Sequence, residues 1–324
     1  MLDNKNANED ALGFDVATVA IKGARSYQED SLIAHFPIGQ DTGFAVLADG
    51  MGGHLGGHVA SALVMTATFS QLKMKERMLE EGELDIPQTL REAAQAANES
   101  VARHDSTADD TYGMGSTLLA TVINRDKLYW VSIGDSPLLL YRGDALRQLN
   151  KDHSLAPQID MMVRTGAMSA EVGRDHPDRN VLTSAVSGYP LTEIDCPSLP
   201  ISLRPDDILI IASDGIQFLP SNKIAQTLKL ASHGHAIEIA NALLEALTLL
   251  DDPNQDNCAF AIVKLGKNEQ DTSSFDFEGM PVLATTDQED DDKTTSGGGA
   301  TADTPQPDEA KAYWYRGQKY SKDE

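Results

Sequence analysis

The chain has 324 residues, 41% of them hydrophobic, which is enough for one large domain or two ordinary ones with a sizeable core. Its formal net charge of −24 argues against a broad basic surface that binds nucleic acid or anionic lipid, because both are polyanions. No stretch reaches the roughly 18 unbroken apolar residues of a membrane span, and the polar, acidic N-terminus lacks the pattern of a secretory signal.

Seven short apolar runs bounded by turn residues predict β-strands. Several of them follow one another without an intervening helix, which favours an antiparallel α+β arrangement over a doubly wound parallel sheet. The predicted strands are Val16–Ile21, Ser31–Phe36, Phe44–Ala48, Thr117–Ile123, Leu128–Ile133, Ile208–Ala212 and Cys258–Val263.

Helical spacing of apolar residues predicts three helices. The first follows His58, the second follows Pro87, and the third covers 236–250 and is apolar on more than one side, so we expect it to be buried. The expected apolar stripes are Val59, Leu63, Thr66 and Phe69 in the first helix, and Leu90, Ala94, Ala97 and Val101 in the second.

A change in composition divides the chain into a domain over residues 13–266 and a tail over residues 267–324. The tail stretch "DQEDDDKTTSGGGATADTPQPDEAK" has few large apolar residues, so we expect disorder there. Its end, "AYWYRGQKYSKDE", regains aromatic and basic residues and is either a docking peptide or a tail without function. From Glu269 onward there are fourteen acidic and five basic residues, a net charge of −9, which leaves −15 on the preceding residues.

The glycine-rich turn "LADGMGGHLGGH", residues 47–58, allows three interpretations. A dinucleotide loop is disfavoured because the glycine spacing departs from GxGxxG and because Asp49 would repel a diphosphate. A zinc site would use His54 and His58, but Leu55 stands where a zincin has its glutamate. The third interpretation is a carboxylate cluster that holds hard cations.

Acidic residues recur where the predicted strands begin or end. Converging carboxylates repel one another unless cations lie between them, and oxygen ligands favour Mg²⁺ or Mn²⁺. We expect the neighbouring glycines to allow a carbonyl to approach the metal and to adopt positive φ. The acids in question are Glu29, Asp30, Asp49, Asp135, Asp214 and Asp256.

The order of these motifs resembles that of the metal-dependent protein serine/threonine phosphatases of type 2C. The similarity extends over about residues 13–265, and residues 152–188 are similar to the flap of the bacterial branch. The motifs that carry it are Arg25 with Gln28-Glu29-Asp30, Asp49-Gly50-Met51-Gly52-Gly53, Gly115-Ser116-Thr117, Gly134-Asp135-Ser136, Ser213-Asp214-Gly215 and Asp256-Asn257.

The resemblance implies a sandwich of two antiparallel β-sheets flanked by helices, with a dinuclear metal centre at one end and a flap insertion. Two Mn²⁺ or Mg²⁺ ions would be bound there, and a third, weaker metal is possible at Asp135. By resemblance, Asp49 bridges both metals, and the carbonyl of Gly50 binds one of them. Asp214 and Asp256 hold the other metal. Glu29 and Asp30 act through water, and Arg25 grips the substrate phosphate.

The implied activity is hydrolysis of phosphoserine and phosphothreonine in proteins by a metal-activated water. Met51 stands where many eukaryotic relatives have a candidate acid histidine. Two alternatives are a same-fold phosphatase dedicated to a stress-pathway regulatory protein and a non-catalytic phosphoprotein-binding adaptor. We expect a monomer that opposes a serine/threonine kinase. We also expect it in the cytoplasm, because Cys196 and Cys258 are too few for a disulfide framework.

Overall fold

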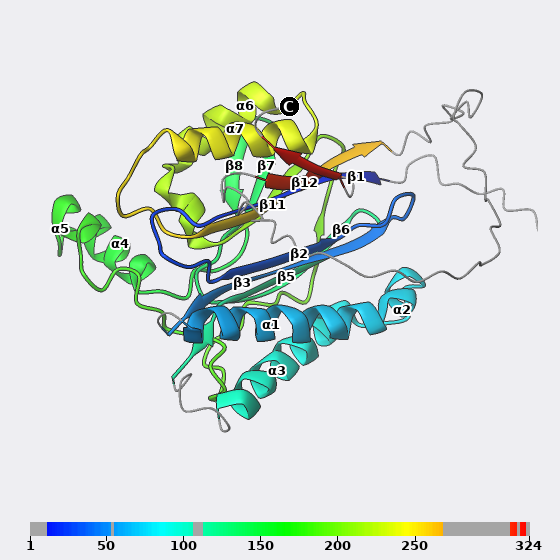
Figure 1. Ribbon diagram of the computed structural model, residues 1–324, viewed down its shortest axis with the longest axis horizontal. Coiled ribbons are helices and arrows are strands. Elements are labelled where there is room, and N and C mark those ends of the chain that lie inside the picture. The colour runs from blue at the N-terminus through cyan, green and yellow to red at the C-terminus, as the bar shows by residue number, and fades with distance from the viewer. Residues whose placement is uncertain (1–11, 53–54, 106–112, 268–311, 316–317, 322–324) are drawn as a thin grey trace, which may run out of the picture.

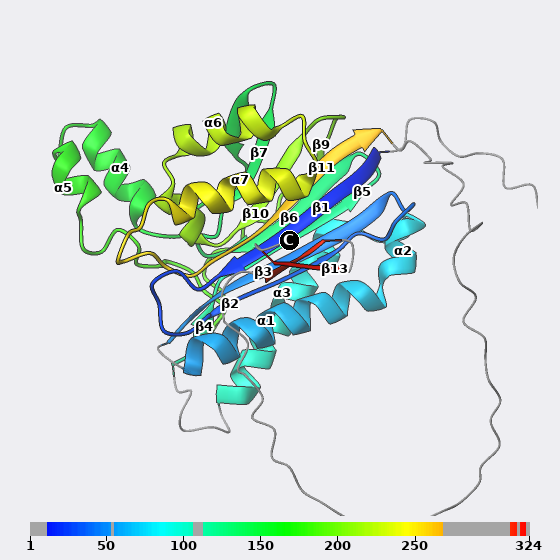
Figure 2. The same ribbon diagram turned by 45° about the horizontal axis from the view of Figure 1, so that its top comes forward.

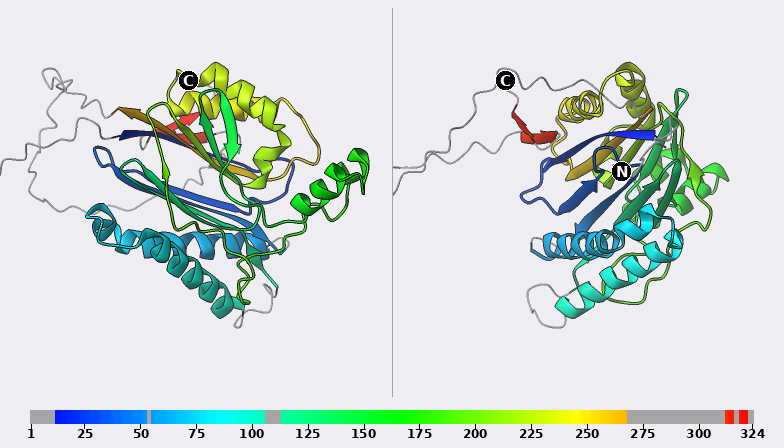
Figure 3. Two further views of the ribbon diagram at one scale, coloured as in Figure 1. Left: turned by 180° about the vertical axis from the view of Figure 1, so that it is seen from behind. Right: turned by 90° about the vertical axis from the view of Figure 1, so that its right-hand side faces the viewer.

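The computed structural model describes residues 12–52, 55–105, 113–267, 312–315 and 318–321. Two antiparallel β-sheets stack face to face, and helices cover the outer face of each sheet (Figures 1 and 3). This arrangement is the predicted α+β sandwich. None of the helices in the described part of the chain combines the length and the apolar character that crossing a membrane requires.

The first sheet has the strand order β1-β11-β10-β7-β8, and every neighbouring pair is antiparallel. Its central strand β10 is apolar throughout because both of its faces are buried. Ile208 and Ile210 belong to the core beneath the helices, whereas Leu209 and Ile211 belong to the core between the sheets. The strands are β1 (Leu12–Ile21), β7 (Leu138–Arg142), β8 (Ala145–Gln148), β10 (Ile208–Ala212) and β11 (Cys258–Lys267).

The second sheet has the order β2-β3-β5-β6-β9, with the short strand β4 paired to the end of β3. Its inner face packs on the first sheet through Leu47 and Leu119, and its outer face packs on helices through Phe44 and Val122. The strands are β2 (Asp30–His35), β3 (Thr42–Met51), β4 (Gly115–Ser116), β5 (Leu118–Asn124), β6 (Lys127–Ile133) and β9 (Ile201–Ser202).

Two pairs of helices cover the sheets. Helices α1 (Leu55–Met74) and α3 (Ile86–Asp105) lie on the second sheet, and α6 (Ser221–Ala231) and α7 (Ala236–Thr248) lie on the first (Figure 1). The short helix α2 (Glu76–Glu80) lies between α1 and α3 in the chain.

A further pair of helices stands away from the sheets at one end of the sandwich (Figure 2). These are α4 (Ala156–Arg164) and α5 (Ala170–Arg174), which lie within residues 152–188 and are called here the α4–α5 segment. The 3-10 helix η2 (Asp214–Phe218) directly follows β10.

All seven predicted strands and all three predicted helices are present, with shifted ends in every element except β10. The stripe predicted for α3 is fully buried, but in α1 Thr66 is exposed. The most buried stripe of α1 instead repeats every four residues. The predicted third helix stops at Thr248, and the two leucines that follow it are exposed. The fully buried stripe of α1 is Ala60, Val64, Thr68 and Leu72.

The predicted domain boundaries differ slightly from the ends of the outer strands. Strand β1 begins at Leu12, and β11 continues to Lys267, which pairs with Leu12. In the predicted tail, β12 (Ala312–Tyr315) and β13 (Gln318–Ser321) pair antiparallel. The remaining tail residues lie outside the described residues, so the expectation of disorder stays a prediction.

Candidate functional site

The predicted acidic residues of the second sheet lie at one end of the sandwich. Asp30 is the first residue of β2, and Asp49 lies near the end of β3. In the antiparallel register of these strands the two aspartates are directly opposite each other. Like charges in that position destabilise a sheet unless a counter-charge offsets them. This cross-strand pair is the first indication that a cation belongs here.

The first sheet brings two more carboxylates to the same end. Asp214 opens η2 directly after β10, and Asp256 lies two residues before β11, the antiparallel neighbour of β10. Asp135 follows β6 of the second sheet, at a turn where Gly134 has a φ of 99°. Both sheets therefore contribute acidic residues to one cluster.

The pKa of Asp49 shows how close these carboxylates are. Burial raises that pKa well above its usual value, and the carboxylates of Asp30, Asp214, Asp135 and Asp256 raise it further. The pKa of Asp214 is raised first by burial and then by Asp256. Asp49 thus lies among four other acidic side chains.

Asp30 and Asp135 are perturbed in the same direction. Burial raises the pKa of Asp30 to about 7, although the hydroxyl of Ser213 donates to its Oδ2 at 2.8 Å. Its other oxygen, Oδ1, is buried and accepts no hydrogen bond. Burial also raises the pKa of Asp135 to about 7, and the charges of Asp214 and Asp152 add to the effect. Ionised carboxylates are therefore costly here without a cation.

The donor set fits a hard cation in its chemistry. Carboxylate oxygens are the ligands that Mg²⁺ and Mn²⁺ prefer, and Asp30 Oδ1 is a buried acceptor without a donor. Within the described residues, however, no three His, Cys, Asp or Glu side chains are grouped as a ready-made metal site. A cation would have to draw the side chains together. The zinc interpretation is untested, since His54 lies outside the described residues and His58 is exposed.

The glycines of the two Asp-Gly pairs are required by close packing. A Cβ at Gly50 would lie 2.0 Å from the carbonyl oxygen of Gly57, and one at Gly215 would lie 2.0 Å from that of Asn257. Neither glycine has a positive φ, so that part of the prediction is wrong for both. It holds for Gly52, whose φ is 126°.

Arg25, predicted to grip the substrate phosphate, lies beside the cluster. Its Nη2 donates to Oδ2 of Asp256 at 2.5 Å, and its side chain is 55% exposed. The two residues are 231 positions apart in the chain. In this structure the guanidinium therefore neutralises a predicted metal ligand.

Glu29 links the two sheets through its backbone. Its N–H donates to Oδ1 of Asn257 at 2.8 Å, and its carbonyl accepts the N–H of Gly50 at 3.2 Å. Its carboxylate lies so close to Gly57 that a Cβ there would be 2.6 Å from Oε1. The predicted water-binding residue therefore lies between the Asp49-Gly50 turn and Asn257.

Asn257 has a structural role that the sequence motif did not reveal. Its buried side chain donates from Nδ2 to the carbonyls of Lys22 and Tyr27, each at 2.8 Å, and accepts from the N–H of Glu29. It thereby fixes the loop between β1 and β2, which carries Arg25, to the start of β11. Only the distant pairing of β1 with β11 brings these groups together.

Hydroxyl groups of the Gly-Ser-Thr motif hold the backbone of Asp49. Thr117 Oγ1 accepts the N–H of Asp49 at 2.9 Å, and Ser116 Oγ donates to the carbonyl of Asp49 at 2.8 Å. Thr117 Oγ1 also lies 2.7 Å from Oγ of Ser136, next to Asp135. These residues were part of the predicted motif, but no role was predicted for them.

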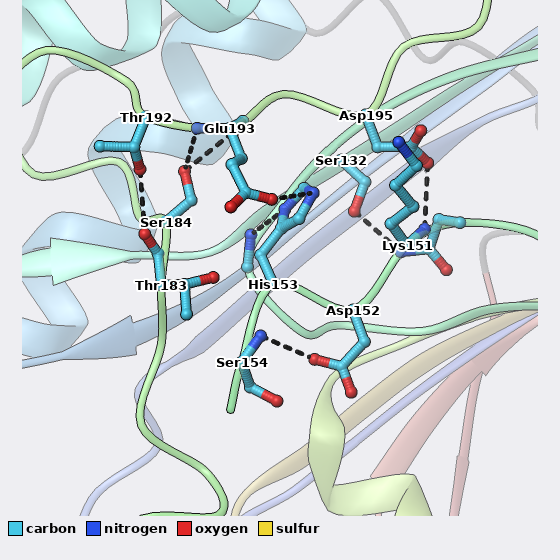
Figure 4. Close-up of polar contacts among 12 residues, drawn as sticks. Ser132, Lys151, Asp152, His153, Ser154, Thr183, Ser184, Thr192, Glu193 and Asp195 are labelled. Carbon is cyan, nitrogen blue, oxygen red and sulfur yellow. Dashed lines mark hydrogen bonds and ion pairs between the residues drawn. The ribbon is translucent and has the colours of Figure 1, made fainter. Parts of the chain in front are cut away.

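A polar network around His153 and Asp195 anchors the chain that leads into α4 (Figure 4). Buried His153 accepts the N–H of Gly134 at Nδ1, 3.2 Å away, and donates its own N–H to the Gly134 carbonyl at 3.1 Å. Its carbonyl accepts the N–H of Thr183 at 2.8 Å. Asp195 accepts the N–H of Lys151 at 3.0 Å. The segment is thus fixed to the turn that presents Asp135.

Comparisons with known proteins agree with this fold. The family model for protein phosphatase 2C matches residues 26–247. The serine/threonine phosphatase stp of Listeria monocytogenes is 31% identical over 185 residues, which are 57% of this chain and 71% of the relative.

Solved structures give the same result. The Mycobacterium tuberculosis serine/threonine phosphatase PstP/Ppp has a TM-score of 0.66 at 29% identity, over 78% of this chain and 99% of that one. The catalytic domain of PstP in complex with two manganese ions has a TM-score of 0.62 at 27% identity, over 79% and 99% of the two chains. The chain therefore belongs to the protein phosphatase 2C family and is a metal-dependent protein serine/threonine phosphatase of the bacterial type.

Proposed function

We propose that this phosphatase acts through two divalent cations, Mn²⁺ or Mg²⁺, held by Asp49, the carbonyl of Gly50, Asp214 and Asp256. The proposal depends mainly on one observation, the position of Asp49 among the carboxylates of Asp30, Asp135, Asp214 and Asp256, which add to the effect of burial in raising its pKa. A cation between them would remove the repulsion that raises the pKa. The two manganese ions in the solved PstP catalytic domain support this assignment.

When bound, the cations would supply a water of lowered pKa as the nucleophile and would offset the negative charge of the phosphoryl oxygens. Asp49 is suited to the bridging position because it lies between the carboxylates of both sheets. Asp135, whose pKa is raised by burial and by the charge of Asp214, forms with Asp214 a candidate third, weaker site. Glu29 and Asp30 orient water molecules through their carboxylates.

Arg25 has two partners in this proposal. In this structure it neutralises Asp256 at 2.5 Å. A cation bound to Asp256 would take over that role, and the guanidinium would then be able to donate to a phosphoryl oxygen in a charge-assisted contact. Met51 has no proton to give, so the proton for the leaving group comes from water.

The substrates are proteins carrying phosphoserine or phosphothreonine, and we infer that the enzyme opposes a serine/threonine kinase. We further propose that the α4–α5 segment is the flap and that residues 13–266 form the catalytic domain. We place the enzyme in the cytoplasm as a monomer. The two buried free cysteines, Cys196 and Cys258, are compatible with a reducing compartment.

The experiment that tests the metal assignment measures binding and turnover separately. Calorimetric titration of Mn²⁺ into the metal-free protein should show two sites, and the Asp214→Asn variant should lose one of them. Hydrolysis of p-nitrophenyl phosphate and of a phosphothreonine peptide should require Mn²⁺ or Mg²⁺ and should disappear in the variant. Unaltered Mn²⁺ binding and turnover by Asp214→Asn would refute the assignment.

A further inference from the structure

A groove extends from the acidic cluster to the α4–α5 segment. Its volume is about 1060 Å³, and its lining includes Asp135 and Asp214 of the acidic cluster and Arg164 and Arg174 of the α4–α5 segment. Residues of η2 and of the start of α6 also line it. A phosphorylated residue bound at the acidic cluster would therefore have its neighbouring residues in this groove.

The groove is lined by side chains of both charges. Its carboxylates are Asp135, Asp152, Asp160 and Asp214, and its guanidinium groups are Arg164, Arg174 and Arg179. Arg179 is neutralised by Asp160, which accepts from both Nη atoms at 2.8 and 3.1 Å.

Arg164 and Arg174 are different from Arg179. Both are exposed, and neither forms an ion pair with a carboxylate of the described residues. The pKa of Asp160 is lowered first by its hydrogen bonds from Arg179 and further by the charge of Arg164, which lies close to it. Asp160 is paired with Arg179, however, so neither Arg164 nor Arg174 has an ion-pair partner of its own among the described residues.

Packing between α4 and α5 holds the backbone that carries Arg164 and Arg174. Arg164 is the last residue of α4, and Arg174 is the last residue of α5. The two helices touch closely at Gly173, where a Cβ would lie 2.4 Å from Cγ2 of Val163. Ser169 caps α5 by accepting the N–H of Val172 at 3.2 Å. The backbone positions of both arginines are therefore fixed next to the groove.

We propose that Arg164 and Arg174 bind a second anionic group of the substrate, carried on residues that flank the phosphorylated one. The group is a carboxylate or another phosphate, since both present the oxygen pairs that guanidinium binds. This inference deepens the proposed function and depends on it. It makes the enzyme selective for phosphorylation sites in acidic or multiply phosphorylated segments.

The test compares phosphothreonine peptides on the full-length enzyme with Mn²⁺. One peptide series carries a glutamate moved stepwise along the chain, a second carries glutamine at the same positions, and a third carries a second phosphothreonine. We expect the best glutamate peptide to have about a tenfold higher kcat/KM than its glutamine partner, mainly through KM, because the contact is uniform binding. The doubly phosphorylated peptide shows whether phosphate or carboxylate is preferred.

The variant Arg164→Glu/Arg174→Glu should lose this discrimination and retain turnover of p-nitrophenyl phosphate. The matched control, Arg77→Glu/Arg125→Glu, makes the same charge change at exposed arginines that do not line the groove. It should keep the discrimination.

Two results would overturn the inference: equal kcat/KM for the glutamate and glutamine series, or equal losses in the test and control variants. Failure of the proposed function looks different, because p-nitrophenyl phosphate would then not be hydrolysed by the wild-type enzyme. In that case fluorescence anisotropy of the same peptides still measures binding. Equal affinity of the glutamate and glutamine peptides would refute the inference, and a preference for glutamate lost only in Arg164→Glu/Arg174→Glu would support it.

Discussion

Replacing Asn257 by alanine should destabilise the protein and impair catalysis together. The side chain makes three hydrogen bonds of 2.8 Å, to the carbonyls of Lys22 and Tyr27 and from the N–H of Glu29. Each such bond contributes about 1 kcal/mol, so the loss of all three should lower the free energy of unfolding by about 3 kcal/mol. Asn257→Ala does not alter Asp256, so the variant keeps every predicted metal ligand.

Urea unfolding of the metal-free protein, followed by circular dichroism, measures this loss. The matched control is Asn98→Ala, another buried asparagine that holds a loop. Its side chain donates to the Tyr189 carbonyl at 2.8 Å and accepts from the Gly188 N–H at 2.9 Å, so about 2 kcal/mol should be lost.

The two variants should differ in activity. Because Asn257 fixes the loop that carries Arg25, Asn257→Ala should lower kcat/KM for a phosphothreonine peptide by about 10–100-fold even under conditions where it is fully folded. Asn98→Ala should leave kcat/KM within a small factor of the wild type. An ordinary substitution lowers the free energy of unfolding by about 1 kcal/mol. If Asn257→Ala lowers it by no more than that, the three hydrogen bonds do not hold the loop and the reasoning fails.

Four further outcomes are expected. Asp214→Asn should abolish Mn²⁺-dependent hydrolysis while circular dichroism shows an intact fold; normal turnover would remove Asp214 from the site. Arg25→Ala should lower kcat/KM for a phosphopeptide by a factor that corresponds to a loss of roughly 1.5–3 kcal/mol of transition-state stabilisation. It should not raise the Mn²⁺ concentration needed for half-maximal activity. An unchanged kcat/KM would mean that Arg25 only forms a surface ion pair with an aspartate. In EDTA, the free energy of unfolding should fall as pH rises from about 4 to about 7, because burial raises the pKa of Asp30 and of Asp135 from the usual 3.8 to about 7, so that both hold more protons in the folded state; a flat profile in urea titrations would contradict this. A chain ending at Lys267 should stay folded and hydrolyse p-nitrophenyl phosphate, whereas an insoluble product would show that the domain extends further.

The strands were predictable wherever burial on both faces forces a continuous apolar run. Strand β10 has the predicted bounds, Ile208–Ala212, for that reason. The hairpin of β7 and β8 was missed although its signal is present in the sequence. Gly143 and Asp144 both have positive φ, 55° and 64°, which is the geometry of a type I′ hairpin turn.

The candidate site could be predicted residue by residue but not in its geometry. Acids at strand ends are visible in the sequence, and they do gather at one end of the sandwich. The opposition of Asp30 and Asp49 depends on the register of β2 and β3, which the sequence pattern did not fix. The contact of Arg25 with Asp256 joins positions 231 residues apart, so no local pattern encodes it. Individual ligand roles stay predictions.

Because both sheets supply carboxylates to the cluster, metal binding would affect the stability and the abundance of the protein in the cell. Asp49 comes from one sheet, and Asp214 and Asp256 come from the other. Cations bound between them would join the two halves of the sandwich, so part of the binding free energy would become resistance to unfolding. Scarcity of manganese or magnesium would then reduce the amount of enzyme as well as its rate, because loosened sheets are exposed to proteases. The supply of metal would thereby set the abundance of this phosphatase.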